Sequence, residues 1–239
     1  MELEEALVYW IGSVSKEIRI WIKVDEVNSA PNWELPRSLS LWHNQGLVTI
    51  QIASMDHALD LVAAIQESKE HLAPHFDWIS LPQTYATQRA RLQALEQAPR
   101  PYGAYNFHLF QKSNLIGAFS LHHRLRGAGL DWEIGYWIHP DHLRQGFGTL
   151  ALCGALWLQR EFLPGHAYLQ VHTQNQRGLD FLAKNHLWPE HKTTRVTLQG
   201  VGEDVMVFRP GIDKEPNFET SPVAYMIEAW KLKLIEVEW

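Results

Sequence analysis

The chain has 239 residues, a formal net charge of −6 and a pI near 6.1. This length supports one sizeable core with terminal extensions rather than two full domains, and a hydrophobic content of 46% is ordinary for a globular protein. The acidic balance argues against a general nucleic-acid binder, and no stretch approaches the ~20 apolar residues of a membrane span. The N-terminal stretch MELEEALVYW is acidic where a signal peptide is basic, so we expect a cytoplasmic protein.

The cysteine and histidine content argues against a metal site. The single cysteine, Cys153, excludes an internal disulfide and is expected to be a small buried residue. The histidines include His122-His123 and His139-x-x-His142, but no cysteine or carboxylate set accompanies them at ligand spacing. We therefore expect solvated or hydrogen-bonded histidines and no bound metal.

Residues 1–36 read as an extension that precedes the main domain. Glu17 to Val24 alternates apolar and charged residues, as a half-buried strand does, and Asn28 to Pro36 carries two prolines and reads as a linker. Gly46 to Ala53 is the predicted first strand of the core, and Ser54 is a predicted helix N-cap. The helix after it has one apolar stripe, formed by Ala58, Leu61, Val62 and Ile65.

A second helix is predicted over Gln83 to Gln97, and strands then follow in quick succession. Ala104 to Phe110 and Leu115 to His122 flank a short turn and predict a hairpin. Arg124 to Leu130 carries two glycines and is predicted to be a loop. The segment after it, Asp131 to Thr149, is the most informative part of the chain.

This segment reads as a strand, a glycine loop and the start of a helix. Glu133 to Ile138 is aromatic and β-branched, which is typical of a strand, and Pro140 ends the pairing because it has no N–H to donate. Gly146 and Gly148 allow a tight turn, and Thr149 to Arg160 is rich in good helix formers. Unpaired N–H groups and the helix dipole converge at such a point, so we expect a phosphate-bearing cofactor there.

Several kinds of loop fit these glycines, including a plain strand-to-helix turn. A Walker loop needs a Lys followed by Ser or Thr after its last glycine, and Phe147-Gly148-Thr149 has no such Lys. A dinucleotide fingerprint is met only in its looser form, with Ala151 in the last place, and His172-Thr173 stands where its acidic residue belongs. The third phosphate loop is the pyrophosphate loop of acetyltransferases, and the glycines alone leave it and the plain turn both open.

The segments after the loop favour the pyrophosphate loop. Gly165 to His172 reads as a strand, and Thr173 to Trp188 reads as a short helix with an apolar face formed by Leu179, Leu182 and Ala183. With the EIGYWI-x-P strand, the glycine loop, Asn175 and Lys184, these segments resemble the GNAT N-acetyltransferase superfamily. The closest resemblance is to its RimL/RimJ branch, which acetylates ribosomal-protein and other N-terminal amines.

The resemblance covers roughly Gly46 to Pro210 and implies the fold. The expected fold is α+β, the three-layer GNAT acyl-CoA N-acyltransferase fold, with a mixed, mostly antiparallel twisted sheet flanked by helices. Thr193 to Thr197 and Val205 to Phe208 are the predicted closing hairpin, and the tail from Val223 to Trp239 fits an amphipathic helix or a strand.

The expected organisation is an N-terminal extension (1–36), an acetyltransferase domain (37–210) and a C-terminal extension (211–239). The last of these is expected to pack on the core of a monomer or on the partner subunit of a homodimer.

The resemblance also implies a site for acetyl-CoA as co-substrate. The Asp131 strand is expected to splay from its neighbour, so that backbone groups near Trp137 and Ile138 bond the pantetheine arm and the acyl carbonyl. Asn175 is expected to bond the cofactor arm or a catalytic water, although Asn is also a common helix N-cap. The pyrophosphate is expected to bind the N–H groups of Arg144, Gln145, Gly146, Phe147, Gly148 and Thr149.

Glu133 is the candidate catalytic base. Strand alternation puts its side chain on one face with those of Gly135 and Trp137. A carboxylate is a weak base unless it is buried, so we expect it to act through water. The competing interpretation is a solvated strand residue or the ion-pair partner of a nearby Arg. Trp78, Trp132 and Trp137 either border the acceptor site or simply pack in the core.

Some residues depart from the branch pattern and leave the general acid open. Gly178 replaces the Ser of Asn-x-x-Ser, and Leu182 stands where many relatives carry a Tyr that protonates the leaving thiolate. His172, at the end of the preceding strand, is a candidate substitute, and Tyr136 is a weaker one. Water is the remaining proton source.

The predicted function is an acyl-CoA-dependent N-acyltransferase that moves acetyl from acetyl-CoA to a primary amine by direct attack. The acceptor is a protein or peptide N-terminus or a small-molecule amine, and a longer acyl donor also fits the aromatic content. An α-amine, with a reference pKa of ~8 against ~10.4 for lysine, is more often neutral at pH 7. The alternative from another class is a degenerate module that binds CoA or a protein partner without catalysis.

Overall fold

A computed structural model describes residues 35–43, 45–98, 104–126, 129–210 and 236–238. The predicted strand at Glu17 to Val24 and most of the predicted linker lie outside these residues. The elements follow in the order β1 (Ser38–His43), β2 (Gly46–Ile52), η1 (Met55–His57), α1 (Ala58–Leu72), η2 (Asp77–Ser80), α2 (Tyr85–Gln97), β3 (Ala104–Gln111), β4 (Asn114–Arg126), β5 (Gly129–Ile138), η3 (Pro140–His142), α3 (Phe147–Phe162), β6 (His166–His172), α4 (Gln176–Lys184), β7 (Trp188–Val196), β8 (Gly202–Arg209) and β9 (Glu236–Glu238).

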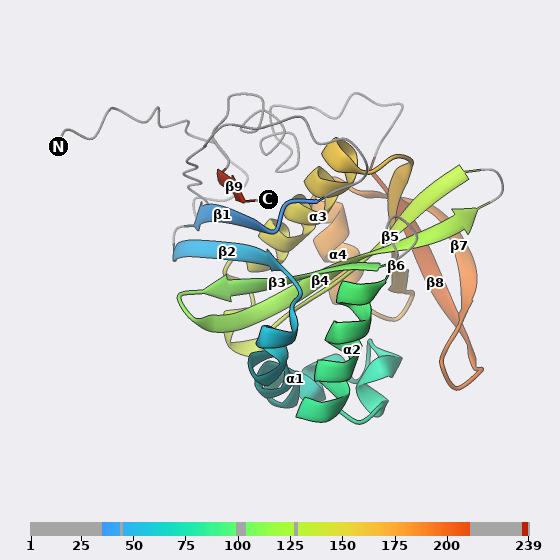
Figure 1. Ribbon diagram of the computed structural model, residues 1–239. Coiled ribbons are helices and arrows are strands. Elements are labelled where there is room, and N and C mark those ends of the chain that lie inside the picture. The colour runs from blue at the N-terminus through green and yellow to red at the C-terminus, as the bar shows by residue number, and fades with distance from the viewer. Residues whose placement is uncertain (1–34, 44, 99–103, 127–128, 211–235, 239) are drawn as a thin grey trace, which may run out of the picture.

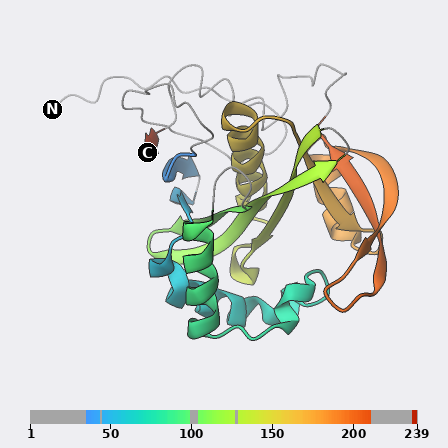
Figure 2. The same cartoon turned by 45° about the vertical axis from the view of Figure 1, so that its right-hand side comes forward.

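The strands form one mixed sheet in the order β7-β8-β6-β5-β4-β3-β2-β1-β9. Among the recorded pairings, β5–β6 is parallel and the others are antiparallel. Figures 1 and 2 show α3 on one face of the sheet and α1 and α2 on the other. The expected α+β fold, with a mostly antiparallel sheet flanked by helices, is confirmed.

The alternation of side chains along β5 builds two separate cores. Trp132, Ile134 and Ile138 point to the face covered by α3, where they join the larger cluster of buried residues. Trp137 points to the opposite face and packs with α1 residues in the smaller cluster. The predicted alternation is therefore confirmed, and it places Glu133 on the α1 face because Glu133 and Trp137 are four residues apart.

Helix α3 is buried along most of its length because it crosses the centre of the larger core. Every residue from Leu150 to Gln159 is buried, which matches the nearly continuous apolar sequence there. The prediction that Cys153 is a buried residue is confirmed, and burial raises the pKa of its thiol. The helix begins at Phe147, two residues earlier than predicted.

Two sequence-based expectations about strands are wrong, and the predicted N-cap at Ser54 belongs to a shorter helix than expected. Gly46 to Ala53 is not the first strand of the core, because β1 precedes it and pairs with it along its whole length. The predicted loop at Arg124 to Leu130 is mostly strand, because β4 continues to Arg126 and β5 already begins at Gly129. Ser54 caps the short turn η1 rather than the long helix: its hydroxyl accepts from the Asp56 N–H at 3.2 Å.

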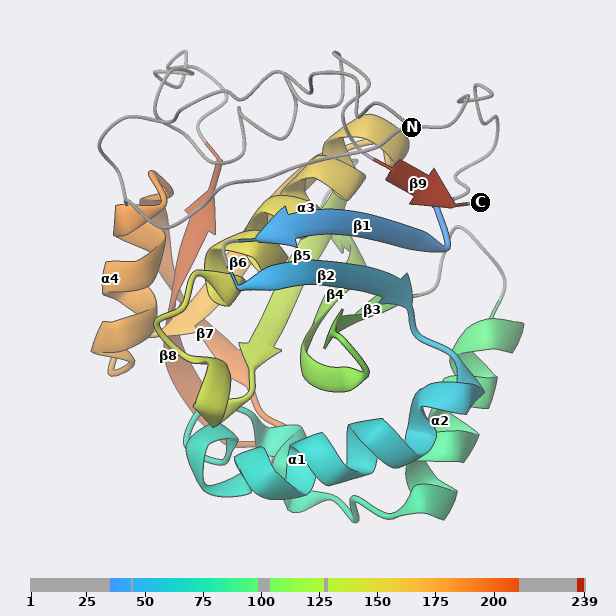
Figure 3. The same cartoon turned by 90° about the vertical axis from the view of Figure 1, so that its left-hand side faces the viewer.

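The last described residues return to the sheet. Strand β9 pairs with the outer edge of β1, with Val237 opposite Leu39 (Figure 3). Within the described residues, no helix is long and apolar enough to span a membrane. No trio of His, Cys, Asp or Glu side chains in the same residues is arranged to hold a metal ion.

Gly117 lets β4 approach the end of β5 closely, and this provides a test of the packing there. A Cβ at this position would lie 2.5 Å from the Trp137 carbonyl oxygen, which is backbone and cannot move aside. We expect Gly117→Ala to lower the free energy of unfolding by about 1–3 kcal/mol. Gly135→Ala in the adjacent strand is the matched control, because its nearest neighbour would be the Ser120 hydroxyl at 3.2 Å. Urea unfolding of both variants checks this, and equal losses would contradict it.

Candidate active site

The parallel strands β5 and β6 separate after a short stretch of pairing. They pair only from Asp131–His166 to Glu133–Tyr168. Beyond this point β5 stays paired with β4 as far as Ile138, whereas β6 pairs with β8 from Leu169 onward. We call this divergence the fork. It confirms the expected splay, and it leaves one edge of residues 134–138 without a strand partner.

The glycine loop at the open end of the fork has the geometry of an anion site. Gly146 is the N-cap of α3 with φ 92°, a left-handed conformation that favours glycine, and Arg144 also has a positive φ of 59°. The first backbone bond of the helix is donated by Leu150 to the Gly146 carbonyl at 3.0 Å. The N–H groups ahead of Leu150 therefore have no partner within the helix.

Side chains brace this loop from both sides. Gln145 donates from Nε2 to the Asp141 carbonyl at 2.8 Å. Phe147 is fully buried between the rings of His43 and His142, at centroid distances of 4.6 and 5.6 Å. The loop conformation is thus held by protein contacts. This favours a preformed anion site over a loop that must reorganise to bind.

An aromatic contact links α4 to the loop and to β5. The Phe181 ring lies 5.5 Å from the Tyr136 ring, and a Cβ on Gly148 would meet Phe181 at 3.3 Å. The second glycine of the loop therefore makes room for an aromatic side chain of α4. Burial raises the pKa of the Tyr136 phenol, so this hydroxyl gives up its proton less readily than a solvated one.

Asn175 caps α4, as one of its two predicted roles requires. Its side-chain oxygen accepts from the Gly178 N–H at 3.0 Å. A Cβ on Gly178 would lie 2.9 Å from both Asn175 Nδ2 and Val171 Cγ1. The family's Ser would not fit beside this cap, which gives a physical reason for the glycine. The amide Nδ2 has no recorded protein acceptor in the described part of the chain and can still donate to a ligand.

Leu182, which stands at the position of the family's Tyr, and His172, the candidate substitute, lie in unlike surroundings. Leu182 is fully buried in the larger core, so the position of the family's Tyr faces away from the site. His172 lies at the open end of β6, with its Nε2 2.9 Å from Arg195 Nη2 and 3.1 Å from Glu203 Oε2. A residue engaged in this way is not a free donor at that nitrogen.

Glu133 lies at the closed end of the fork and is the partner of an arginine. Its Oε2 accepts from Arg124 Nε at 2.9 Å and from the Tyr168 hydroxyl at 3.3 Å. The ion pair matches the competing interpretation from the sequence. The two roles are compatible, because the second carboxylate oxygen has no recorded partner among the described residues and 20% of the side chain is exposed.

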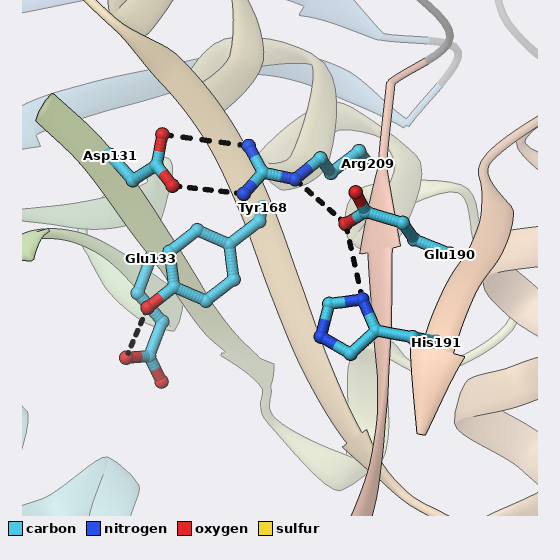
Figure 4. A network of polar contacts seen from close by, with 6 residues as sticks. All are labelled: Asp131, Glu133, Tyr168, Glu190, His191 and Arg209. Atoms are coloured by element: carbon cyan, nitrogen blue, oxygen red, sulfur yellow. Dashed lines mark hydrogen bonds and ion pairs between the residues drawn. The ribbon is translucent and has the colours of Figure 1, made fainter. Parts of the chain in front are cut away.

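A polar network that the sequence did not reveal supports this end of the fork (Figure 4). Arg209 of β8 contacts both oxygens of the buried Asp131, at 2.9 and 3.5 Å, and its Nε donates to Glu190 of β7 at 2.8 Å. The same guanidinium lies 5.7 Å from the centre of the Tyr168 ring. These contacts join four strands and fix the ring whose hydroxyl reaches Glu133.

The β7–β8 hairpin reaches across the sheet to the segment after α1 (Figure 2). The Leu198 N–H donates to Asp77 Oδ2 at 2.8 Å, and Gln199 Nε2 donates to the Ser80 hydroxyl at 3.1 Å. These contacts join residues about 120 positions apart, at separations of 121 and 119. They connect the β7–β8 hairpin to η2, the short helix that follows α1.

The tryptophans expected near the acceptor divide between the two faces. Trp132 is fully buried in the larger core, and its Nε1 donates to the Pro164 carbonyl at 2.7 Å, so it does not border the α1 face. Trp137 and Trp78 contribute to the smaller core on that face. Core packing, the competing interpretation, therefore holds for Trp132 and Trp137.

The chain belongs to the GNAT acetyltransferase family. The family model for the acetyltransferase (GNAT) domain matches residues 48–187, which include the fork, the glycine loop and α4. The chain is accordingly an enzyme of the GNAT type. No curated protein is significantly similar to it in sequence.

Solved acetyltransferases share the fold at low sequence identity. Mycobacterium smegmatis RimJ in complex with CoA-disulfide is 18% identical with a TM-score of 0.68, and the match covers 85% of this chain and 97% of RimJ. RimL, a ribosomal L7/L12 alpha-N-protein acetyltransferase in complex with CoA, is 18% identical with a TM-score of 0.61, covering 70% and 96%. The microcin C7 self-immunity acetyltransferase MccE, in complex with acetyl-CoA and AMP, is 15% identical with a TM-score of 0.61, covering 69% and 92%. The expected RimL/RimJ-like fold is confirmed.

The buried position of Leu182 makes a specific prediction about restoring the family's Tyr. Leu182→Tyr places a larger side chain and a hydroxyl in a closed core, so we expect a loss of about 1–3 kcal/mol in the free energy of unfolding and no gain in acetyl transfer. Leu179→Tyr, on the partly buried face of the same helix, is the comparison and should be tolerated better. Thermal unfolding and thiol release measure the two effects; an L182Y enzyme that is both stable and faster would contradict the assignment.

Proposed function

We propose that this enzyme transfers an acetyl group from acetyl-CoA to a primary amine, and that the amine is the N-terminus of a protein or peptide. The observation that supports this most strongly is the fork with the glycine loop at its open end. The unpaired edge of residues 134–138 leads along the chain to the glycine loop, whose N–H groups before Leu150 have no partner within the helix. An extended arm that ends in a diphosphate fits that path.

The residues present fit such a ligand. Buried backbone groups need hydrogen-bond partners. An amide-bearing arm can supply them to β5 beyond the point where β6 leaves it. The helix N-terminus and the N–H groups of residues 144–149 suit the diphosphate, and Arg144 is exposed beside them. RimJ and RimL, which share the fold, have CoA in their solved structures, and that of MccE has acetyl-CoA.

The reaction needs one proton removed and one supplied. The amine nitrogen attacks the thioester carbonyl, the carbon–sulfur bond breaks, and the ammonium proton must leave before or during attack. Backbone N–H groups near Trp137 and Ile138 would stabilise the oxyanion, worth roughly 3 kcal/mol for a donor. The free oxygen of Glu133 would accept the amine proton, directly or through water.

The thiolate proton is best supplied by solvent. Leu182 is buried in the core, the Tyr136 phenol is a weakened acid, and His172 is engaged by Arg195 and Glu203. A CoA thiolate is a modest base that water can protonate, so a dedicated acid is dispensable. His172 thus becomes a weaker candidate for this role than the sequence indicated.

A small-molecule amine is the second candidate acceptor. The name of MccE describes self-immunity to microcin C7, and its structure holds AMP, so this fold also serves enzymes outside ribosomal-protein modification. A longer acyl donor, a cytoplasmic location, a monomeric or homodimeric state and the absence of nucleic-acid and membrane partners stay predictions.

Thiol release tests the function directly. The full chain is mixed with acetyl-CoA and either N-terminal peptides or small amines, and free thiol is followed with an aromatic disulfide reagent. The buried Cys153 contributes little background. Acetylated product in the mass spectrum confirms transfer; CoA binding without thiol release for any amine would instead support the degenerate module.

Replacing Glu133 tests its role as base. Glu133→Gln keeps the shape and removes the proton acceptor, so we expect kcat/KM for the amine to fall about 10²-fold, within the range for general base catalysis. The KM for acetyl-CoA should stay unchanged. Glu161→Gln, at an exposed position near the end of α3, is the charge-matched control. A loss below about threefold would leave Glu133 as only a partner of Arg124.

A further inference from the structure

Basic side chains converge where the ends of α1 and β6 meet the start of α4, three elements that are visible together in Figure 3. His71 lies in the last turn of α1 and His75 just after it, His172 ends β6, and Arg177 lies in the first turn of α4. Arg195 of β7 lies beside His172 at 2.9 Å. We call these five residues the basic cluster.

Within the described residues, the charges recorded as acting on His71 and His75 belong to other basic side chains. Burial, and then the charges of His71, His172 and Arg177, lower the pKa of His75, and burial followed by Arg177 lowers the pKa of His71. His57, at the other end of the helix, differs because three carboxylates oppose the effect of its burial. Arg177 is exposed and forms no ion pair with any residue in the described part of the chain. After burial, its charge contributes to the lowered pKa of both imidazoles, which indicates that its guanidinium lies near them.

Arg195 brings a further donor that is not fully used. Its Nη2 lies 3.2 Å from Glu203 Oε2 and 2.9 Å from His172 Nε2. Arg195 Nη2 and Glu203 Oε2 therefore both lie beside the same nitrogen of His172. Arg195 Nε is buried and has no hydrogen-bond partner among the described residues. Among the described residues, Glu203 is the carboxylate with ion-pair contacts to the cluster, through His172 and Arg195, and the two arginines exceed it in charge.

Within the cluster, His172 points to the α1 face of the fork, at a defined distance from Glu133. Tyr168 is the register partner of Glu133, and Tyr168 and His172 point to the same face because they are four residues apart on β6. Four residues of strand span roughly 13 Å. Helix α3, whose N-terminus is the proposed diphosphate site, packs against the opposite face. An anion bound by the cluster would therefore lie about four extended residues from an amine at Glu133.

We propose that the basic cluster binds an acidic side chain three or four residues into a polypeptide acceptor. This deepens the proposed function and rests on it, because the N-terminal amine must lie at Glu133. A free amino acid carries its carboxylate next to its amine and cannot span the two points. An acidic side chain near the third or fourth residue of an extended chain can. The hairpin contacts at Asp77 and Ser80 hold the segment that carries His75, so the anion site is preformed.

Paired peptides test the proposal on the unmodified enzyme. One peptide begins Ser-Ala-Asp-Glu and the other Ser-Ala-Asn-Gln, both amidated at the C-terminus. We expect kcat/KM to favour the acidic peptide by about tenfold, the size of one charged hydrogen bond. Free serine and glutamate should be poorer acceptors than either. Equal rates for the two peptides would overturn the cluster proposal and leave the proposed function intact, whereas no acetylation of any amine would overturn the function itself.

Substitutions that change the charge of Arg177 test whether the preference for the acidic peptide comes from the basic cluster. Arg177→Gln should reduce the acidic preference to under about threefold, and Arg177→Glu should reverse it toward a Ser-Ala-Lys-Lys peptide. Arg160→Gln, an equal charge change at the exposed end of α3, should retain the full preference. The KM for acetyl-CoA should not change in any of them. If R177Q instead raises that KM and slows both peptides equally, the cluster serves the phosphates of CoA and the proposal is wrong.

Discussion

The structure depends on the early end of the β5–β6 pairing. A parallel pair of strands that stops after Glu133–Tyr168 leaves backbone donors and acceptors of residues 134–138 without a sheet partner. Such groups are costly when buried without a partner, and an amide-bearing ligand can pair with them as a strand would. The other edge of β5 remains paired with β4 as far as Ile138, which holds the strand in place.

The fork is supported at both ends by contacts of different kinds. At the closed end, the two-pronged contact of Arg209 with Asp131 joins β8 to β5, and this charge-assisted geometry is directional. At the open end, Phe147 anchors the glycine loop in the larger core, and Phe181 packs against Gly148. Rigid surroundings matter for transfer chemistry because the enzyme contributes mostly position and hydrogen bonds.

The departures from the family pattern form a consistent set. Gly178 accommodates the inward Asn175 cap, and Leu182 belongs to the core while its neighbour Phe181 faces the loop. In the proposed reaction solvent, rather than a side chain of α4, supplies the proton that the leaving thiolate takes up. The charged residues near the fork are instead suited to the acceptor: Glu133 to the proton of its amine, and the basic cluster to an acidic side chain further along it.

The sequence by itself determined the features that are local in the chain. The period-two alternation of β5, the glycine loop before α3 and the Asn175 cap each depend on residues a few positions apart, and local propensity governs them. Strand β1 escaped prediction because SLSLWH is short and ambiguous, and the β4–β5 extension escaped because its glycines read as a loop. Tertiary structure alone decided the Arg124–Glu133 pair, the Arg209 network and the contact of Leu198 with Asp77. These contacts join residues up to about 120 positions apart, at separations of 9, 78 and 121 for Glu133, Asp131 and Asp77. Such contacts exist only after the sheet has chosen its strand order and register.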